Sequence, residues 1–179
     1  MKNILPLQIM LLCFTLGVAA QGDYLITGNS AGKVKLGMTI QQARMAMSNC
    51  RFKRSSDGEG IALVSITCGK KNVMSLFAGE EGYESPINWN RRIEFIQVWD
   101  KRFKTLEGIH PEISLRSAEK ILGKVREIII TPTESREFVT FRKVRKGIEY
   151  RTYGGIYTRP SVTTTKYESG SRIVSIQVY

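Results

Sequence analysis

Two segments of the chain, residues 92–99 and 172–179, repeat the same alternation of apolar and polar side chains (RIEFIQVW and RIVSIQVY). Strict alternation is typical of a β-strand that buries one of its faces. In the first segment Ile96 and Val98 point to one side, and Trp99 points to the other. We therefore predict that each segment is a strand of an antiparallel sheet, with its apolar face against a core and its aromatic end residue on the outer surface.

A second pair of segments, residues 34–43 and 109–118, recurs with helical rather than alternating spacing. Thr39 and Ser114 occupy equivalent positions and are good helix N-caps, because a hydroxyl accepts a hydrogen bond from an amide of the first turn. Gln42, three residues after Thr39, completes the pattern of a capping box. Each segment thus predicts a helix of about ten residues, which is too short to be stable alone in water and must pack on a sheet.

Both pairs keep the same order, so each copy begins with the helix segment and ends with the closing strand. Further strand candidates lie between them, separated by polar or glycine-containing turns. They span residues 51–56, 61–68 and 73–78 in the first copy and residues 127–131, 137–142, 148–153 and 163–168 in the second. The predicted fold class is α+β, with two tandem repeats, each a short helical segment packed on an antiparallel sheet. The repeats would span residues 21–100 and 101–179.

Residues 1–20 have the three-part pattern of a cleaved secretory signal peptide. Lys2 is followed by an apolar run over residues 4–18, and the segment ends in small residues (VAA). A membrane anchor is the alternative, but the run is shorter than the roughly 20 apolar residues that span a bilayer. Cys13 lies inside this run and follows Leu12, which disfavours lipid attachment. We expect a periplasmic or secreted protein.

Residues 36–43 (LGMTIQQA) resemble the start of the repeat in beta-lactamase inhibitory proteins. The segment is also similar to small outer-membrane assembly lipoproteins with a helix-pair-plus-sheet fold. The resemblance implies a non-enzymatic binding domain that presents a contact surface on its sheet, and the inhibitory proteins carry the unit twice. The motif covers about eight residues, and in the second copy Glu112 replaces its glycine and Pro111 precedes it, so no inhibitory residue is transferred to this chain.

The chain is basic, with 27 lysine and arginine residues against 16 aspartate and glutamate residues. A net charge of this size favours an anionic partner, such as a lipid surface, an acidic polymer or an acidic protein, or it only keeps the protein soluble. Nucleic acid is not expected, because the chain is exported and lacks a basic motif interleaved with aromatic residues.

Cys50 and Cys68 are the two cysteines that remain after the signal segment. In an oxidising compartment such a pair forms a disulfide, which would stabilise the fold by roughly 3 kcal/mol. A redox pair or part of a metal site is the alternative, but the spacing is too wide for a CxxC motif and the single histidine, His110, lies far away in the sequence.

The candidate binding residues are aromatic side chains and arginines in the strands and loops of both copies. Aromatic residues and arginine are enriched at protein interfaces. The alternative is that the aromatic residues cover the second sheet face or pack between the copies. The candidates are Trp89, Trp99, Tyr150, Tyr153, Tyr157 and Tyr179, with Arg142 and Arg145 in the densest basic run.

No catalytic set is evident. The sequence lacks metal-ligand spacing, a phosphate-binding loop and a dinucleotide fingerprint, so no metal site or cofactor is predicted. The leading hypothesis is an exported module that contacts a protein partner in the envelope or outside the cell, as an inhibitor or assembly factor. The first alternative is a basic protein that binds an anionic polymer or lipid surface. The second is a hydrolase, which requires a cleft where two carboxylates converge.

Overall fold

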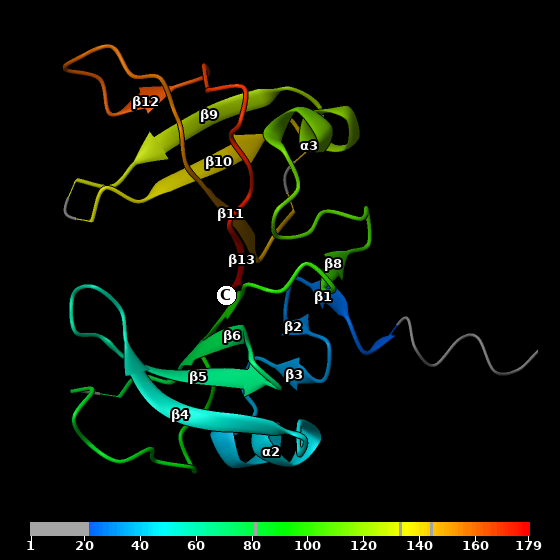
Figure 1. Cartoon of the computed structure of the whole chain (residues 1–179), viewed down its shortest axis with the longest axis vertical. Helices are drawn as coiled ribbons and strands as arrows, with labels where there is room; N and C mark the ends of the chain where they lie inside the picture. Colours follow the sequence, from blue (N-terminus) through cyan, green and yellow to red (C-terminus); the bar gives the residue numbers. More distant parts are fainter. Residues whose placement is uncertain (1–21, 81, 133, 144) are drawn as a thin grey trace, which may run out of the picture.

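The computed structural model describes residues 22–80, 82–132, 134–143 and 145–179 (Figure 1). These residues form two short helices and thirteen strands in two sheets. Neither described helix is long and apolar enough to cross a bilayer. The predicted signal peptide, residues 1–20, lies outside the described residues.

The larger sheet has nine strands, and every neighbouring pair is antiparallel. Its strand order is β12-β9-β10-β11-β13-β7-β6-β5-β4. Four strands come from the first part of the chain, β4 (Cys50–Ser56), β5 (Ala62–Cys68), β6 (Lys71–Phe77) and β7 (Phe95–Val98), and five from the second, β9 (Val125–Ile130), β10 (Glu137–Phe141), β11 (Ile148–Thr152), β12 (Thr163–Thr164) and β13 (Ser175–Val178).

The two closing strands predicted from the alternating segments meet at the centre of this sheet. β7 and β13 run antiparallel to each other, with Gln97 opposite Gln177. These two glutamines are also equivalent in the sequence recurrence, 80 residues apart. Ile176 lies opposite Val98 in the same register. The two recurring segments therefore pair with each other about Gln97 and Gln177, the residues that are equivalent in the recurrence.

The predicted fold class is wrong. The chain is mostly β, and its large sheet is continuous across both parts of the chain rather than divided between two helix-plus-sheet repeats. The physical reason is that β7 and β13 pair with each other. Left apart, each would be the edge strand of a smaller sheet and would expose unpaired backbone groups. The residue boundary drawn between positions 100 and 101 stays a prediction.

A small sheet of four strands was not predicted. It contains β1 (Leu25–Thr27), β2 (Ser30–Ala31), β3 (Val34–Lys35) and β8 (Lys104–Thr105), in the order β3-β2-β1-β8. The pair β1–β8 is parallel and joins two segments far apart in the chain. Strands of two or three residues carry too few positions for alternation to be recognised in the sequence.

The starts of both helices are confirmed. In α2 (Ile40–Ala46) the hydroxyl of Thr39 accepts a hydrogen bond from the Gln42 amide, and the Gln42 side chain accepts one from the Thr39 amide. In α3 (Leu115–Leu122) the Ser114 hydroxyl accepts from the Ser117 amide. The helices are only seven and eight residues long, so they depend on the sheet for stability.

Glu112, which replaces the motif glycine in the second copy, takes the same backbone conformation as Gly37 in the first. Their φ angles are 74° and 78°. The Gly37 amide donates to the Ile93 carbonyl over 2.7 Å, and the Glu112 amide donates to the Ile173 carbonyl over the same distance. The turn before each helix is therefore kept although the glycine is not.

One hydrophobic core unites the two sheets and the two helices. Ile96 and Ile176, at the centre of the large sheet, are 0% exposed, as are Ile40 of α2 and Leu115 of α3. The helices and the small sheet thus cover one face of the large sheet and leave its other face open. The predicted disulfide between Cys50 and Cys68 is confirmed and joins β4 to β5 at their ends.

Candidate functional site

The open face of the large sheet carries a row of polar side chains that runs across six strands. The register places each residue beside the next on the neighbouring strand, so the row crosses the sheet at right angles to the strands. We call it the polar row: Lys53, Ser65, Ser75, Gln97, Gln177 and Glu149. Its centre is the Gln97–Gln177 pair of β7 and β13.

Apolar and aromatic side chains flank the polar row. On one side Phe77 and Phe95 lie opposite each other, and Leu63 is on the adjacent strand β5. All three are half-buried, and we call them the apolar ledge. On the other side Trp99 follows β7 and donates a hydrogen bond from Nε1 to the Ser75 hydroxyl over 3.2 Å.

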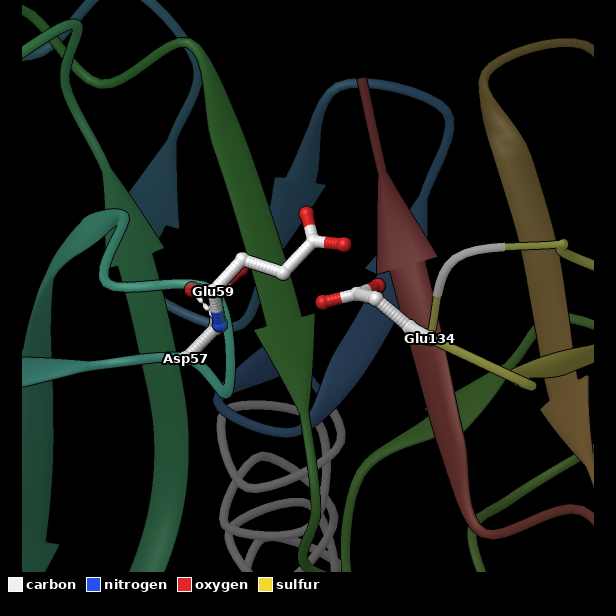
Figure 2. A group of neighbouring side chains, drawn as sticks. All are labelled: Asp57, Glu59 and Glu134. Atoms are coloured by element: carbon white, nitrogen blue, oxygen red, sulfur yellow. Dashed lines mark hydrogen bonds between the residues drawn. The ribbon is translucent and has the colours of Figure 1, made fainter.

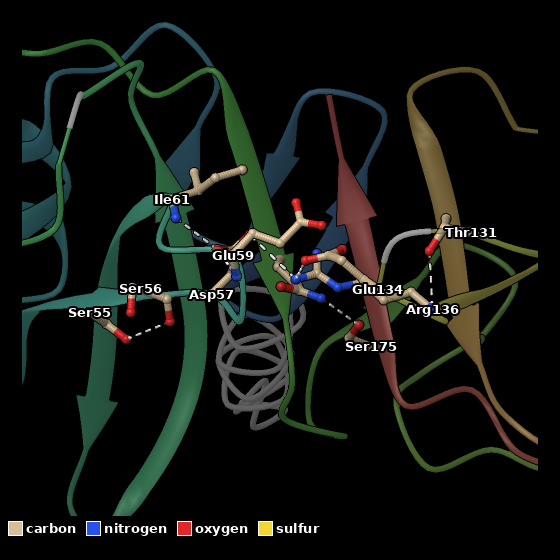
Figure 3. Close-up of polar contacts among 10 residues, drawn as sticks. Ser55, Ser56, Asp57, Glu59, Ile61, Thr131, Glu134, Arg136 and Ser175 are labelled. Atoms are coloured by element: carbon tan, nitrogen blue, oxygen red, sulfur yellow. Dashed lines mark hydrogen bonds and ion pairs between the residues drawn. The ribbon is translucent and has the colours of Figure 1, made fainter.

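Two loops meet over the central strands, one from each part of the chain (Figures 2 and 3). The first joins β4 to β5 and is held by Asp57, whose Oδ1 accepts hydrogen bonds from the amides of Glu59 (3.0 Å) and Ile61 (2.8 Å). The second joins β9 to β10 and contains Glu134 and Arg136. The Arg136 Nη2 atom pairs with Asp57 Oδ2 over 3.3 Å and also contacts the Glu134 carboxylate.

Asp57, Glu59 and Glu134 bring one carboxylate oxygen each within 4.8 Å of one another. Figure 2 shows the Glu59 and Glu134 side chains facing each other above the central strands. A set of three carboxylates has the donor chemistry of a calcium or magnesium site. Here Asp57 and Glu134 form ion pairs with Arg136 instead, and Glu59 forms no ion pair with a described residue.

The loops, the four middle residues of the polar row (Ser65, Ser75, Gln97 and Gln177) and the apolar ledge line a groove of about 870 Å³ on the open face. A volume of this size accommodates a small ligand or a few residues of a peptide. Charged, amide, hydroxyl and aromatic side chains all face it. The lining residues include Asp57, Glu59, Glu134, Arg136, Arg151, Gln97, Gln177, Asn72, Ser65, Ser75, Leu63, Phe77, Phe95 and Trp99.

The floor of the groove contains polar side chains that have no partner among the described residues. Gln177 is only 6% exposed, yet its side-chain amide makes no hydrogen bond to a described residue. Its neighbour Gln97 does, donating to the Ser175 hydroxyl over 3.0 Å. The Gln177 amide keeps contact with solvent, so its free donors and its acceptor face the groove.

Charged groups beside Gln177 are also incompletely compensated. Burial lowers the pKa of Arg151, and the nearby Arg136 lowers it further while Glu134 opposes the shift. Burial raises the pKa of Glu149, which lies opposite Gln177 in the sheet register. Neither side chain forms an ion pair with a described residue. Of these two groups, Arg151 lines the groove and can donate hydrogen bonds into it.

Of the predicted binding residues, Trp99 lines this groove and the others do not. Tyr150 is 5% exposed and points into the core, where its ring packs edge-on against Phe141 at 5.8 Å. Burial raises the pKa of Tyr150 to about 12. Tyr157 is half-buried beside Gly155, and burial raises its pKa to about 12 as well. For these two tyrosines, packing within the fold accounts for the ring, while neither buried hydroxyl has a hydrogen-bond partner among the described residues.

The remaining candidates are dispersed over the molecule. Trp89 packs near Phe52 and under the Arg44 guanidinium, 4.7 Å from the ring centre. Tyr153 is 43% exposed, and its hydroxyl donates to the Gly170 carbonyl. Tyr179, at the C-terminus, is 59% exposed.

The two arginine candidates are both exposed on a part of the surface that does not line the groove. Arg142 lies alongside Gly123 at the end of α3. Arg145 pairs with Glu107. Together with the dispersed aromatic residues, these positions do not form one surface.

The residues that form the groove were mostly missed in the sequence. Residues 57–60 were predicted only as a turn between the strand candidates 51–56 and 61–68, and the recurring Gln97 and Gln177 only as members of a strand motif. Their alternation with apolar residues signals that both face away from the core. That Glu134 and Arg136 reach the same place depends on the pairing of β7 with β13.

No protein-family model and no curated protein matches the chain. A solved structure with a similar fold is the crystal structure of the uncharacterized protein yfeY from Escherichia coli. The two share 10% sequence identity and a TM-score of 0.56, over 86% of this chain and 97% of that chain. At this identity the likeness shows the fold alone, so this chain has the overall architecture of that structure.

Proposed function

We propose that the protein is an exported, non-enzymatic binding module that takes up a segment of a protein partner in the groove on its open sheet face. The observation that carries the proposal is Gln177 on the floor of the groove, a largely buried residue whose side-chain amide has no hydrogen-bond partner among the described residues. A ligand in the groove would replace the hydrogen bonds that this amide makes with water by bonds of its own.

The composition of the groove supports a peptide segment as the ligand. Amides such as those of Gln97 and Gln177 both donate and accept hydrogen bonds, as the peptide backbone does. The apolar ledge and Trp99 offer surface for apolar side chains. Large aromatic side chains provide much of the binding energy in protein interfaces.

Export supports the same proposal. The N-terminal signal pattern favours the periplasm or the exterior of the cell, where a disulfide such as Cys50–Cys68 persists. The partner would then be a protein of the envelope or the exterior.

The experiment is partner capture from an envelope extract, with the protein produced from its full sequence, purified after export and immobilised. We expect a discrete protein that stays bound at high salt and is lost with Gln177→Leu. Gln41→Leu, on α2 and outside the groove, is the matched control and should retain the partner. Equal capture by both variants, each shown to be folded by its unfolding curve, would exclude the groove as the binding site.

A carboxylate-dependent hydrolase is the second candidate, because Glu59 and Glu134 face each other in the groove. Two carboxylates about 5 Å apart are the arrangement of retaining glycosidases. Asp57 is less suited to such a role, since its two oxygens already bind backbone amides and Arg136. Release of reducing sugar from an envelope polymer, abolished by Glu59→Gln, would favour the hydrolase over the binding module.

Binding of an anionic polymer or lipid surface is the remaining alternative. Lys143, Arg145 and Lys146 line a shallow hollow of about 400 Å³ outside the groove. Contacts of this exposed kind weaken steeply with salt. Capture of only an anionic polymer or lipid, released by salt and unaffected by Gln177→Leu, would favour this alternative.

A further inference from the structure

The groove has an acidic excess on a protein that is otherwise basic. Its lining holds three carboxylates, Asp57, Glu59 and Glu134, against two guanidinium groups, those of Arg136 and Arg151. The whole chain has the opposite balance, with 27 basic and 16 acidic residues. The local excess therefore comes from the placement of the two loops and not from the composition.

The charge within the groove is unevenly compensated. Arg136 forms ion pairs with both Asp57 and Glu134. Glu59 has no cationic partner among the described residues, and its carboxylate lies within 4.8 Å of that of Glu134. A positively charged group placed between Glu59 and Glu134 would contact both.

A second observation in the same groove points to a ligand independently of the carboxylates. Gln177, 6% exposed and without a side-chain hydrogen bond to a described residue, lies on the floor below the loops. Beside it on the floor is the guanidinium of Arg151. Both can donate hydrogen bonds, which main-chain carbonyl groups of an extended segment accept.

The apolar ledge determines what lies next to the positive charge. Leu63, Phe77 and Phe95 face the groove on one side of the polar row. A side chain of the ligand that packs on them must be apolar, because a polar group would lose its hydration there without a partner. The groove therefore offers a carboxylate pair, a hydrogen-bonding floor and an apolar wall side by side.

We infer that the partner segment carries a lysine or arginine side chain next to an apolar residue, with the cation between Glu59 and Glu134 and the apolar side chain on the ledge. The inference rests on the proposed function and names the chemistry of the ligand. An acidic segment is excluded from the groove by the same carboxylates, although the net charge of the protein attracts it from a distance.

The probe is a set of three fluorescent heptapeptide pools with a fixed Leu-X-Leu centre, in which X is arginine, glutamine or glutamate and the flanks are randomised among neutral residues. Fluorescence anisotropy measures their affinities at about 0.15 M salt, where long-range attraction is screened. We expect the arginine pool to bind about 10-fold more tightly than the glutamine pool, and the glutamate pool to bind most weakly. The basic protein repels the arginine pool overall, so its net charge cannot produce this order.

The variants separate this inference from the proposed function. Glu59→Gln should reduce the preference for arginine to less than about 3-fold, while Glu84→Gln, an exposed carboxylate outside the groove, should leave it unchanged. Equal binding of the three pools, weakened by Gln177→Leu, would overturn the inference and keep the groove as a peptide site. If no pool binds, the inference is overturned. If the pools bind but Gln177→Leu does not weaken their binding, both the inference and the proposed function are overturned.

Discussion

Replacing Arg136 by glutamine tests whether the two loops over the sheet are joined through one guanidinium. Arg136 comes from the β9–β10 loop and pairs with Asp57 of the β4–β5 loop and with Glu134 of its own loop. Arg136→Gln keeps a polar side chain of similar length but removes the positive charge. Two largely buried carboxylates then lose their counter-ion.

The expected loss of stability follows from the burial of the three groups. Their side chains are 21% exposed for Arg136, 13% for Asp57 and 16% for Glu134. Exposed ion pairs contribute up to about 1 kcal/mol, and removing one partner of a fully buried pair costs about 3–5 kcal/mol. For these intermediate positions we expect the free energy of unfolding to fall by about 2 kcal/mol. That corresponds to a decrease in melting temperature of about 4–8 °C for a domain of this size.

Urea unfolding of the purified protein measures the change, and Asp57→Asn completes a double-mutant cycle. The asparagine keeps a carbonyl oxygen for the amides of Glu59 and Ile61, so it removes the charge and not the turn. We expect a coupling of about 1 kcal/mol between Arg136 and Asp57. Arg126→Gln, an exposed position of β9, should change stability by less than about 0.5 kcal/mol. A similarly small effect of Arg136→Gln, without coupling, would refute the link between the loops.

Three further predictions concern single positions. Glu112→Gly should raise the free energy of unfolding by about 0.5–1 kcal/mol. The left-handed conformation costs an L-residue about 1–2 kcal/mol, and the greater flexibility of glycine in the unfolded chain offsets part of that gain. Lower stability in denaturant would show that the exposed ion pair between Glu112 and Lys101 outweighs the strain. Glu149→Gln should stabilise the protein at neutral pH and not in acid: burial raises the pKa of Glu149, so its contribution is present below the unfolded pKa and is lost as the pH rises through the folded pKa. An equal effect at both pH values would contradict this. Tyr150→Phe should flatten the fall in stability between pH 10 and about 12, because the pKa of Tyr150 is raised to about 12 and a contribution of up to about 3 kcal/mol is lost over that window. Unfolding curves at both ends of the window measure the effect, and the exposed Tyr179→Phe is the control.

Local features of the fold could be read from the sequence because they depend on residues close together in the chain. The capping box of Thr39 and Gln42 spans three residues, and its hydrogen bonds form as predicted. The alternation in residues 92–99 and 172–179 correctly predicted two strands, β7 and β13. The prediction that only one face of each strand is buried was wrong, because Gln97, Ser175 and Gln177 on the other face are buried as well. The Cys50–Cys68 disulfide follows from a hairpin whose two strands were both recognised.

The fold class and the groove depended on contacts between residues distant in the sequence. The same strands could close two separate sheets or one, and alternation alone does not say which. The pairing of β7 with β13 decided for a single sheet. The starts of both helices were predicted correctly, but the helices are too short to make the fold class α+β.

The amino-acid sequence by itself determined the caps, the strand faces and the cysteine pair, since a hydrogen bond over three residues or a period of two is set by the local order of side chains. Tertiary structure alone decided that Glu59 and Glu134 face each other above Gln177. Each loop is positioned by its own hairpin, and the hairpins are brought together by the central strand pair. A side chain from one part of the chain meets one from the other only after that pair has formed, which is why the groove has no signature in the order of the residues.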